Sequence, residues 1–262
     1  MPQLVDVASE GAVTTITLDD PDRLNALGTP MLEALGGALA EAAASDARVV
    51  VLAARGRAFC AGHDLRELQA MRQAEDGGRA AHEALFDRCA GVMRAIREAP
   101  QPVIAQVHGM ATAAGCQLVA TCDMAVASEA ARFGVNGVDL GLFCSTPMVA
   151  LTRNLGRKRA FELLATGRFM DAGEAEAAGL VNHVVSADAL EAETRALAEQ
   201  VASKLPAAVR IGKGAFHAQA ERPVAEAYAL ARDAIVANLQ DPDTAEGIQA
   251  FLEKRPPGWT RP

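Results

Sequence analysis

Two short stretches of small residues, each between an apolar run and a helical pattern, contain the groups best suited to chemistry. They are residues 60–64 (CAGHD) and residues 109–115 (GMATAAG). A backbone N–H at the start of a helix has no intrahelical acceptor and favours negative charge. We predict that the N–H groups of His63 and Ala114 point at such a charge. If they meet at one point they form an oxyanion hole, worth about 3–4 kcal/mol per donor.

The elements that must position these stretches alternate along the first half of the chain. Apolar or alternating runs predict strands at 13–20, 48–54, 102–109 and 123–128, and apolar spacing of three and four predicts helices at 29–45, 78–98 and 114–122. Beyond residue 145 the patterns predict helices almost throughout, at 146–155, 158–165, 172–178, 187–204, 222–239 and 243–254. We therefore predict an α/β core over residues 1–195 and a helical region over residues 196–262.

Composition and charge narrow the classes of partner. The 262 residues are 50% hydrophobic and carry a formal net charge of −8, which argues against nucleic acid as a ligand. A polyanionic small ligand would depend on a few local cations, such as Arg55 and Arg57 or Lys254 and Arg255. No apolar run approaches the roughly 20 residues of a membrane helix, so we expect no membrane association.

The five cysteines have no metal-binding spacing and no CxxC pair. We interpret them as small buried residues in a reducing compartment. The N-terminal residues lack the basic and apolar regions of a signal peptide. We therefore expect a cytoplasmic protein with no metal site.

Six motifs, in a fixed order, resemble the crotonase superfamily of enoyl-CoA hydratases and isomerases. The resemblance implies a spiral of ββα turns with a C-terminal helical region that forms trimers, often paired into hexamers. It also implies an acyl-CoA thioester as ligand, with coenzyme A as part of the substrate and no separate cofactor. The motifs are PDRLNAL (21–27), AFCAGHDL (58–65), GMATAAGCQLVATCDMAVAS (109–128), RFGVNGVDLGL (132–142), AGLVNHVV (178–185) and FLEKRPPGW (251–259).

The same resemblance assigns site residues. The two oxyanion-hole amides map onto His63 and Ala114, and use of the backbone leaves the His63 imidazole without a required role. Lys254 would reach the phosphates of the ligand, commonly across a subunit boundary. The remaining residues expected along the acyl-CoA are Arg23, Ala26, Arg57, Ala61, Gly62, Asp64 and Leu65. Asp64 has a competing structural interpretation, because Asp64 followed by Glu67 is a capping box at a helix start.

The chain departs from the family at both usual catalytic glutamates, which map onto Gln117 and Gly137. Gln117 can orient a water but cannot transfer a proton, and Gly137 has no side chain. Because acid–base catalysis supplies about 10²–10⁴-fold per group, efficient hydration is not expected. Asp139 is the remaining carboxylate near this position. In an extended segment it would share a face with Gly137 and could act as acid or base. The competing interpretation is a structural Asp139 that is hydrogen-bonded to the backbone in a loop.

Three interpretations follow. The first is an acyl-CoA enzyme that isomerises, cleaves or hydrates its substrate, with Asp139 and Gln117 as catalytic candidates. The second is a non-catalytic protein that binds acyl-CoA through an intact oxyanion hole. A third, a cysteine hydrolase using Cys116 or Cys144, would need a neighbouring histidine, and His82, His183 and His217 have the pattern of surface residues.

Overall fold

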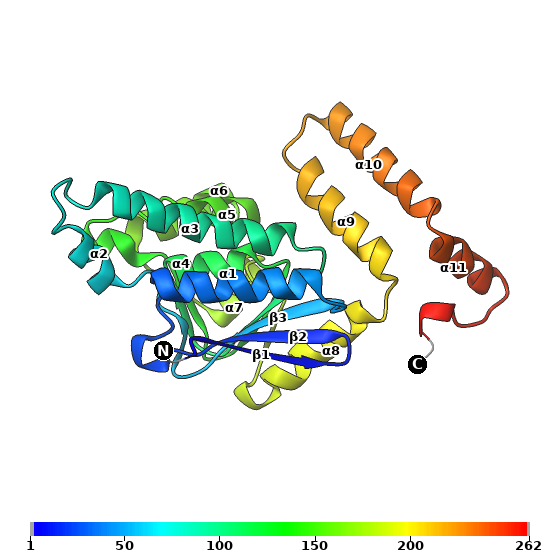
Figure 1. The fold of residues 1–262 in the computed structure, drawn as a ribbon, viewed down its shortest axis with the longest axis horizontal. Coiled ribbons are helices and arrows are strands. Elements are labelled where there is room, and N and C mark those ends of the chain that lie inside the picture. Colours follow the sequence, from blue (N-terminus) through cyan, green and yellow to red (C-terminus); the bar gives the residue numbers. More distant parts are fainter. Residues whose placement is uncertain (1–2, 261–262) are drawn as a thin grey trace.

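The computed structural model, which describes residues 3–260, is built around two sheets. The larger sheet lies under helices α1 (Thr29–Ala44) and α3 (Arg79–Glu98), as Figure 1 shows. Its first two strands are antiparallel and the other neighbours are parallel. In spatial order the strands are β1 (Val5–Glu10), β2 (Val13–Leu18), β3 (Val49–Ala54), β5 (Val103–Val107), β7 (Met124–Ser128) and β10 (His183–Val185).

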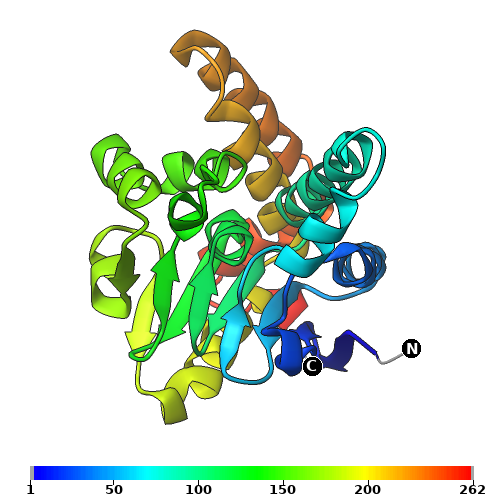
Figure 2. The ribbon, with the colours of Figure 1, turned by 90° about the vertical axis from the view of Figure 1, so that its left-hand side faces the viewer.

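The second sheet has four short strands, and the chain visits the two sheets alternately. β3, β5 and β7 of the larger sheet are followed by β4, β6 and β8 of the smaller one, and helices then lead to the next turn. This is the ββα spiral that the resemblance implied, with helices surrounding the central strands (Figure 2). The strands of the second sheet are β4 (Ala58–Cys60), β6 (Met110–Thr112), β8 (Arg132–Gly134) and β9 (Phe169–Asp171).

Strand β3 shows why these runs are apolar throughout. Val50 and Leu52 belong to the core under α1 and α3, whereas Val49 and Val51 pack with Leu190 of α8 on the opposite face. Alternate residues of a strand point to opposite faces, so a strand covered on both sides is hydrophobic at every position. α8 (Leu190–Ala202) contacts β3, β5 and β7, and the expected domain boundary at residue 195 falls within this helix.

The remaining helices flank the second sheet or extend beyond the core. Helices α4 (Ala114–Thr121) and α7 (Ala172–Ala177) contact strands of the second sheet. Helix α2 (Leu65–Met71) packs on α3, and α5 (Pro147–Asn154) packs on α4 and on α6 (Arg157–Thr166). Short 3-10 helices occur at Pro21–Arg23, Asn136–Leu140, Ala187–Ala189 and Gly258–Thr260. The last three helices form an arm that leaves the core (Figure 1), namely α9 (Pro206–Gln219), α10 (Val224–Leu239) and α11 (Pro242–Leu252).

Six strands and one helix were absent from the sequence prediction, namely β1, β4, β6, β8, β9, β10 and α9. Strand β1 is an edge strand of the larger sheet, and the other five strands are three residues long, so none of them has a long continuous apolar run. Helix α9 contains Gly212 and Gly214, which lower helix propensity, although Pro206 at its first turn is a start signal. Among the described residues, no helix combines the length and apolar character needed to cross a membrane.

Helix α9 is tied to the core by a buried charge cluster. Lys213 Nζ donates to the carbonyls of Ile96 and Gln101, each at 2.9 Å, and to Asp123 Oδ2 at 2.7 Å. His217 Nε2 lies 3.1 Å from Asp123 Oδ1. The expectation that His217 is a surface residue is therefore wrong, since its side chain packs between the arm and the start of β7.

Candidate active site

The two stretches singled out in the sequence lie in direct contact. Gly62 has φ of +85°, and a Cβ added there would lie 2.9 Å from Ala113 Cβ and 3.2 Å from Ala114 N. A Cβ added to Gly115 would lie 2.2 Å from the Cys60 carbonyl oxygen. Only glycine permits such an approach of two backbones, so these glycines allow segments about fifty residues apart in the chain to meet.

Both predicted oxyanion-hole amides lack a partner in the described part of the chain. Neither the His63 N–H nor the Ala114 N–H donates a backbone hydrogen bond there. Ala114 is the first residue of α4 and is 1% exposed. The preceding residue, Ala113, adopts φ of +50° and ψ of −119°, a strained conformation for a residue with a side chain. A buried, unpaired N–H is costly, which is the condition expected at a site for an oxygen ligand.

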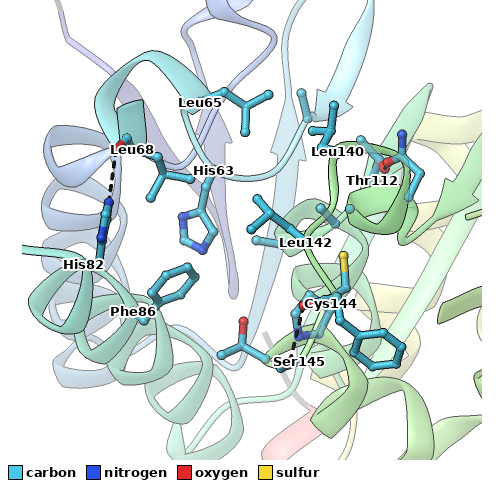
Figure 3. Close-up of a pocket in the computed structure, with 18 of the residues that line it drawn as sticks. His63, Leu65, Leu68, His82, Phe86, Thr112, Leu140, Leu142, Cys144 and Ser145 are labelled. Atoms are coloured by element: carbon cyan, nitrogen blue, oxygen red, sulfur yellow. Dashed lines mark hydrogen bonds between the residues drawn. The ribbon is translucent and has the colours of Figure 1, made fainter. Parts of the chain in front are cut away.

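A cavity of about 1140 Å³ opens beside these amides. Its wall is largely apolar and is formed by α2, α3 and the loop after the 3-10 helix at Asn136–Leu140 (Figure 3). Such a wall suits an acyl chain better than a polar ligand. Lining residues include Ala61, His63, Leu65, Leu68, Phe86, Thr112, Ala114, Asn136, Leu140, Leu142, Phe143 and Cys144.

The predicted acyl-CoA residues divide between two cavities. Ala61 and Leu65 line the large cavity with the two amide-bearing residues. Arg23, Ala26 and Asp64 line a second cavity of about 250 Å³, and Arg23 Nη1 lies 3.6 Å from Asp64 Oδ2.

The two predicted phosphate-binding cations are placed differently. Arg57 is exposed on the loop before β4 and lines neither cavity. Lys254 follows α11 and lines neither cavity.

A residue that sequence reasoning missed holds the segment next to the second cavity. Asn25 is fully buried and has φ of +54°. Its Oδ1 accepts from the Asp20 N–H at 2.9 Å, and its Nδ2 donates to the carbonyls of Arg55, Ala58 and Phe59. These hydrogen bonds hold the segment that contains Arg23 and Ala26 beside β4, the strand that leads to Gly62. The signal for Asn25 was a polar residue between Leu24 and Ala26 in a turn, where asparagine tolerates positive φ.

The capping of α2 follows the prediction in part. Asp64 accepts from the N–H groups of Arg66 at 2.8 Å and Glu67 at 3.4 Å, so it is the N-cap. The reciprocal half of the predicted capping box is wrong. The Glu67 carboxylate instead accepts from the N–H of Thr29 at the start of α1, at 2.9 Å, and so joins two helix starts.

The two positions onto which the family glutamates map are both enclosed by neighbouring residues. Gln117 is 5% exposed, and its Oε1 has no hydrogen-bond partner in the described chain. A Cβ added to Gly137 would lie 2.5 Å from the Leu142 carbonyl oxygen and 2.8 Å from Cys144 Sγ. The loop over residues 137–144 therefore occupies the space that a second catalytic side chain would need.

Asp139 does not reach the large cavity. The expectation assumed an extended segment, but residues Asn136–Leu140 form a 3-10 helix, in which positions 137 and 139 do not share a face. Both carboxylate oxygens of Asp139 lie 3.0 Å from the point where a Gly167 Cβ would stand. The side chain is exposed at the end of α6 and does not line the cavity. The structure thus removes the basis for Asp139 as a proton-transfer group.

The His63 imidazole, in contrast, lies within the cavity (Figure 3). Its Nδ1 is 2.9 Å from the Leu27 carbonyl oxygen, and its Nε2 is buried with no partner in the described chain. The ring meets Phe86 edge to face, with centroids 4.9 Å apart. Burial lowers the pKa of His63 from its ordinary value, while the Leu27 hydrogen bond and the charge of Glu67 oppose that shift.

The cysteines are buried, as predicted, and none is bonded to another. Burial raises the pKa of the Cys116 thiol to about 12 and also raises the pKa of Cys144. A thiol must ionise to act as a nucleophile, so neither residue suits a hydrolase. His82 was expected at the surface, but it lines the cavity and its Nε2 is 3.0 Å from the Leu68 carbonyl oxygen.

Comparison with known proteins places this arrangement in a family. The model of the enoyl-CoA hydratase/isomerase family matches residues 8–262. The chain therefore belongs to the enoyl-CoA hydratase/isomerase family, within the crotonase superfamily.

Particular relatives refine this assignment. The chain is 44% identical over 260 residues to the mouse mitochondrial enoyl-CoA hydratase domain-containing protein 3, covering 99% of this chain and 85% of the mouse protein. A crystal structure of the human protein of that name has a TM-score of 0.93 and 43% identity, covering 98% of this chain and 100% of the human chain. An enoyl-CoA hydratase from Mycobacterium smegmatis is also similar, with a TM-score of 0.93, 50% identity and coverage of 98% and 99% of the two chains.

Proposed function

We propose that this chain binds an acyl-CoA thioester and stabilises its enolate through the N–H groups of His63 and Ala114. The observation that carries the proposal is the contact between the two loops at Gly62. It brings two unpaired amides together at the wall of a cavity large enough for an acyl group. Charge that develops on the thioester oxygen would be met by two fixed donors at the wall of a largely apolar cavity.

The two cavities suit the two ends of such a ligand. We infer that the acyl group occupies the large cavity and that the coenzyme A part extends to the smaller one. Gly62 and Asp64 lie on the loop between them. Arg23, beside that smaller cavity, and Arg57, on the exposed loop nearby, are the cations available to phosphate groups within one chain.

The arm supports a further part of the proposal, a homotrimer or a hexamer made of two trimers. No residue of α10 is fully buried by the described part of the chain, and Tyr228 is 75% exposed and Ile235 55% exposed. On α11, Phe251 is 82% exposed. Apolar surface of this extent normally contacts another protein surface. A neighbouring subunit would cover it, and Lys254 would then approach the phosphates bound by that neighbour.

Within the family, efficient hydration is the activity least favoured by these residues. Neither Gln117 nor Gly137 has a group that can transfer a proton, and a side chain at position 137 has no room. Isomerisation or cleavage of the acyl group needs the enolate but no bound water, so an isomerase or a lyase is the better proposal.

One observation favours a second candidate, a non-catalytic protein that binds acyl-CoA. The carboxylate expected to act in catalysis, Asp139, lies outside the cavity. A binding protein would need the oxyanion hole and the two cavities without a proton-transfer group.

The test combines equilibrium binding with a search for turnover. The protein is titrated with butyryl-CoA and free coenzyme A by calorimetry, then incubated with enoyl-, hydroxyacyl- and malonyl-type CoA thioesters and analysed by mass spectrometry. Binding of the thioester with a new product supports the enzyme, and binding without any product supports the second candidate. If the thioester binds no better than free coenzyme A, the proposed hole is wrong. Asp139→Ala is expected to leave both binding and turnover unchanged.

A further inference from the structure

We propose that the His63 imidazole is a catalytic base, whose Nε2 accepts a proton from the α-carbon of the bound acyl-CoA. The inference rests on the proposed function, because it needs the thioester oxygen at the His63 N–H. It gives His63 two roles, with the backbone amide as oxyanion donor and the side chain as proton acceptor.

The hydrogen bond to Leu27 fixes the form of the ring. A carbonyl oxygen can only accept, so Nδ1 must carry the hydrogen in the contact of 2.9 Å with the Leu27 oxygen. In the neutral ring Nε2 then has a free lone pair. That atom is buried and has no partner in the described chain, and the ring projects into the cavity between Leu68, Phe86 and Leu142 (Figure 3).

The segment that contains Leu27 is itself held in place. The Leu27 N–H donates to the Gly62 carbonyl at 2.7 Å, so Leu27 and the 62–63 segment are joined by two hydrogen bonds in opposite directions. The N–H of Thr29 is fixed by Glu67 at 2.9 Å. The edge of Phe86 closes one side of the ring. A base held this rigidly beside its own oxyanion amide is positioned to act on the carbon adjacent to the thioester carbonyl.

The step balances without a further reactant. The α-carbon to hydrogen bond breaks, the proton moves to Nε2, and the electron pair forms the enolate whose oxygen is held by His63 N–H and Ala114 N–H. The imidazolium keeps its Nδ1 bond to Leu27, and the reverse step returns a proton to the α-carbon. In heavy water the imidazolium exchanges its Nε2 hydrogen for deuterium from the solvent, so the reverse step places deuterium on the α-carbon.

Other titratable groups near the ring are less suited to this role. Glu67, on α2, has both oxygens engaged by the Thr29 N–H. On α3, Glu83 is paired with Arg79. The Nε2 of His82 is bound to the Leu68 carbonyl, and its Nδ1, unlike His63 Nε2, is not a buried atom without a partner. Asp87 also lines the cavity but is exposed.

Across the cavity from the ring, burial raises the pKa of the Cys144 thiol, which disfavours the thiolate. For His63, burial lowers the pKa from 6.5, so the imidazole is an uncharged base at neutral pH.

The experiment measures uptake of deuterium into butyryl-CoA in heavy water by mass spectrometry, with binding measured in parallel. His63→Ala keeps the backbone N–H, and His63→Asn also keeps a side-chain donor for Leu27 but no basic nitrogen. Both variants are expected to bind butyryl-CoA as the parent does and to exchange at least about 100-fold more slowly, within the range for a lost general base. His183→Ala, an exposed histidine on β10, controls for histidine loss and should exchange at the parental rate.

The parental exchange rate is expected to be constant above neutral pH and to fall as His63 protonates, with a midpoint below 6.5. Parental binding without exchange, or exchange that survives in both His63 variants, would overturn the assignment. If His82→Ala or Asp87→Asn loses deuterium exchange while His63→Ala retains it, the catalytic base is a residue of α3. Failure of the parent to bind butyryl-CoA would instead remove the proposed function.

Discussion

The contact between the two loops can be tested by adding a single methyl group at Gly62. In Gly62→Ala the new Cβ would stand 2.9 Å from Ala113 Cβ and 3.0 Å from the Thr112 carbonyl oxygen, so one loop must move. The left-handed backbone costs a residue with a side chain about 1–2 kcal/mol. The collision adds about 1–3 kcal/mol for overpacking. Together these predict a loss of about 2–5 kcal/mol in the free energy of unfolding.

Gly11 provides a matched control for the backbone cost. It has φ of +60° in the β1–β2 turn, and nothing lies within 4 Å of a Cβ added there. Gly11→Ala should therefore lose only the conformational part, about 1–2 kcal/mol. Urea denaturation of both variants separates the two contributions, because the difference between them measures the collision alone.

The same substitution should affect ligand binding. Movement of residues 112–114 separates the Ala114 N–H from the His63 N–H, so Gly62→Ala is expected to weaken binding of butyryl-CoA at least tenfold, whereas Gly11→Ala leaves it unchanged. Equal stability losses in the two variants, with parental binding in both, would refute the conclusion that the two loops touch at this glycine.

Three further outcomes are expected. Lys213→Met leaves the half-buried Asp123 without its cation and should lower the free energy of unfolding in urea by about 3–5 kcal/mol, whereas Lys204→Met, at an exposed position, should change it little. The double variant Gly137→Glu with Gln117→Glu should not hydrate crotonyl-CoA efficiently, because the loop at 137–144 leaves the new side chain at position 137 no room. Hydration is measured by absorbance, and rapid hydration would show that the loop moves freely. Phe251→Asp should shift the oligomer toward monomer in analytical ultracentrifugation, and an unchanged sedimentation coefficient would place the subunit interface elsewhere.

Most of the framework was predictable from the sequence because it depends on local patterns. Continuous apolar runs indicated strands buried on both faces, as β3 confirms, and Asp64 was predicted correctly as a helix cap. The α9 helix was missed because two glycines obscured its periodicity. The packing of Lys213 against Asp123, which anchors that helix, joins residues 90 apart in sequence and has no local pattern.

In the candidate site, too, some features were predictable from the sequence and others were not. The sequence by itself determined which amides lie at helix starts, which glycines permit a close approach, and that glutamates are absent at positions 117 and 137. Only the tertiary structure decided that Asp139 faces Gly167 rather than the cavity, and that the His63 ring enters the cavity with Nε2 free. The reason is physical. Hydrophobic periodicity and capping act over a few residues, whereas the direction of a side chain depends on backbone turns and on contacts with segments distant in the chain.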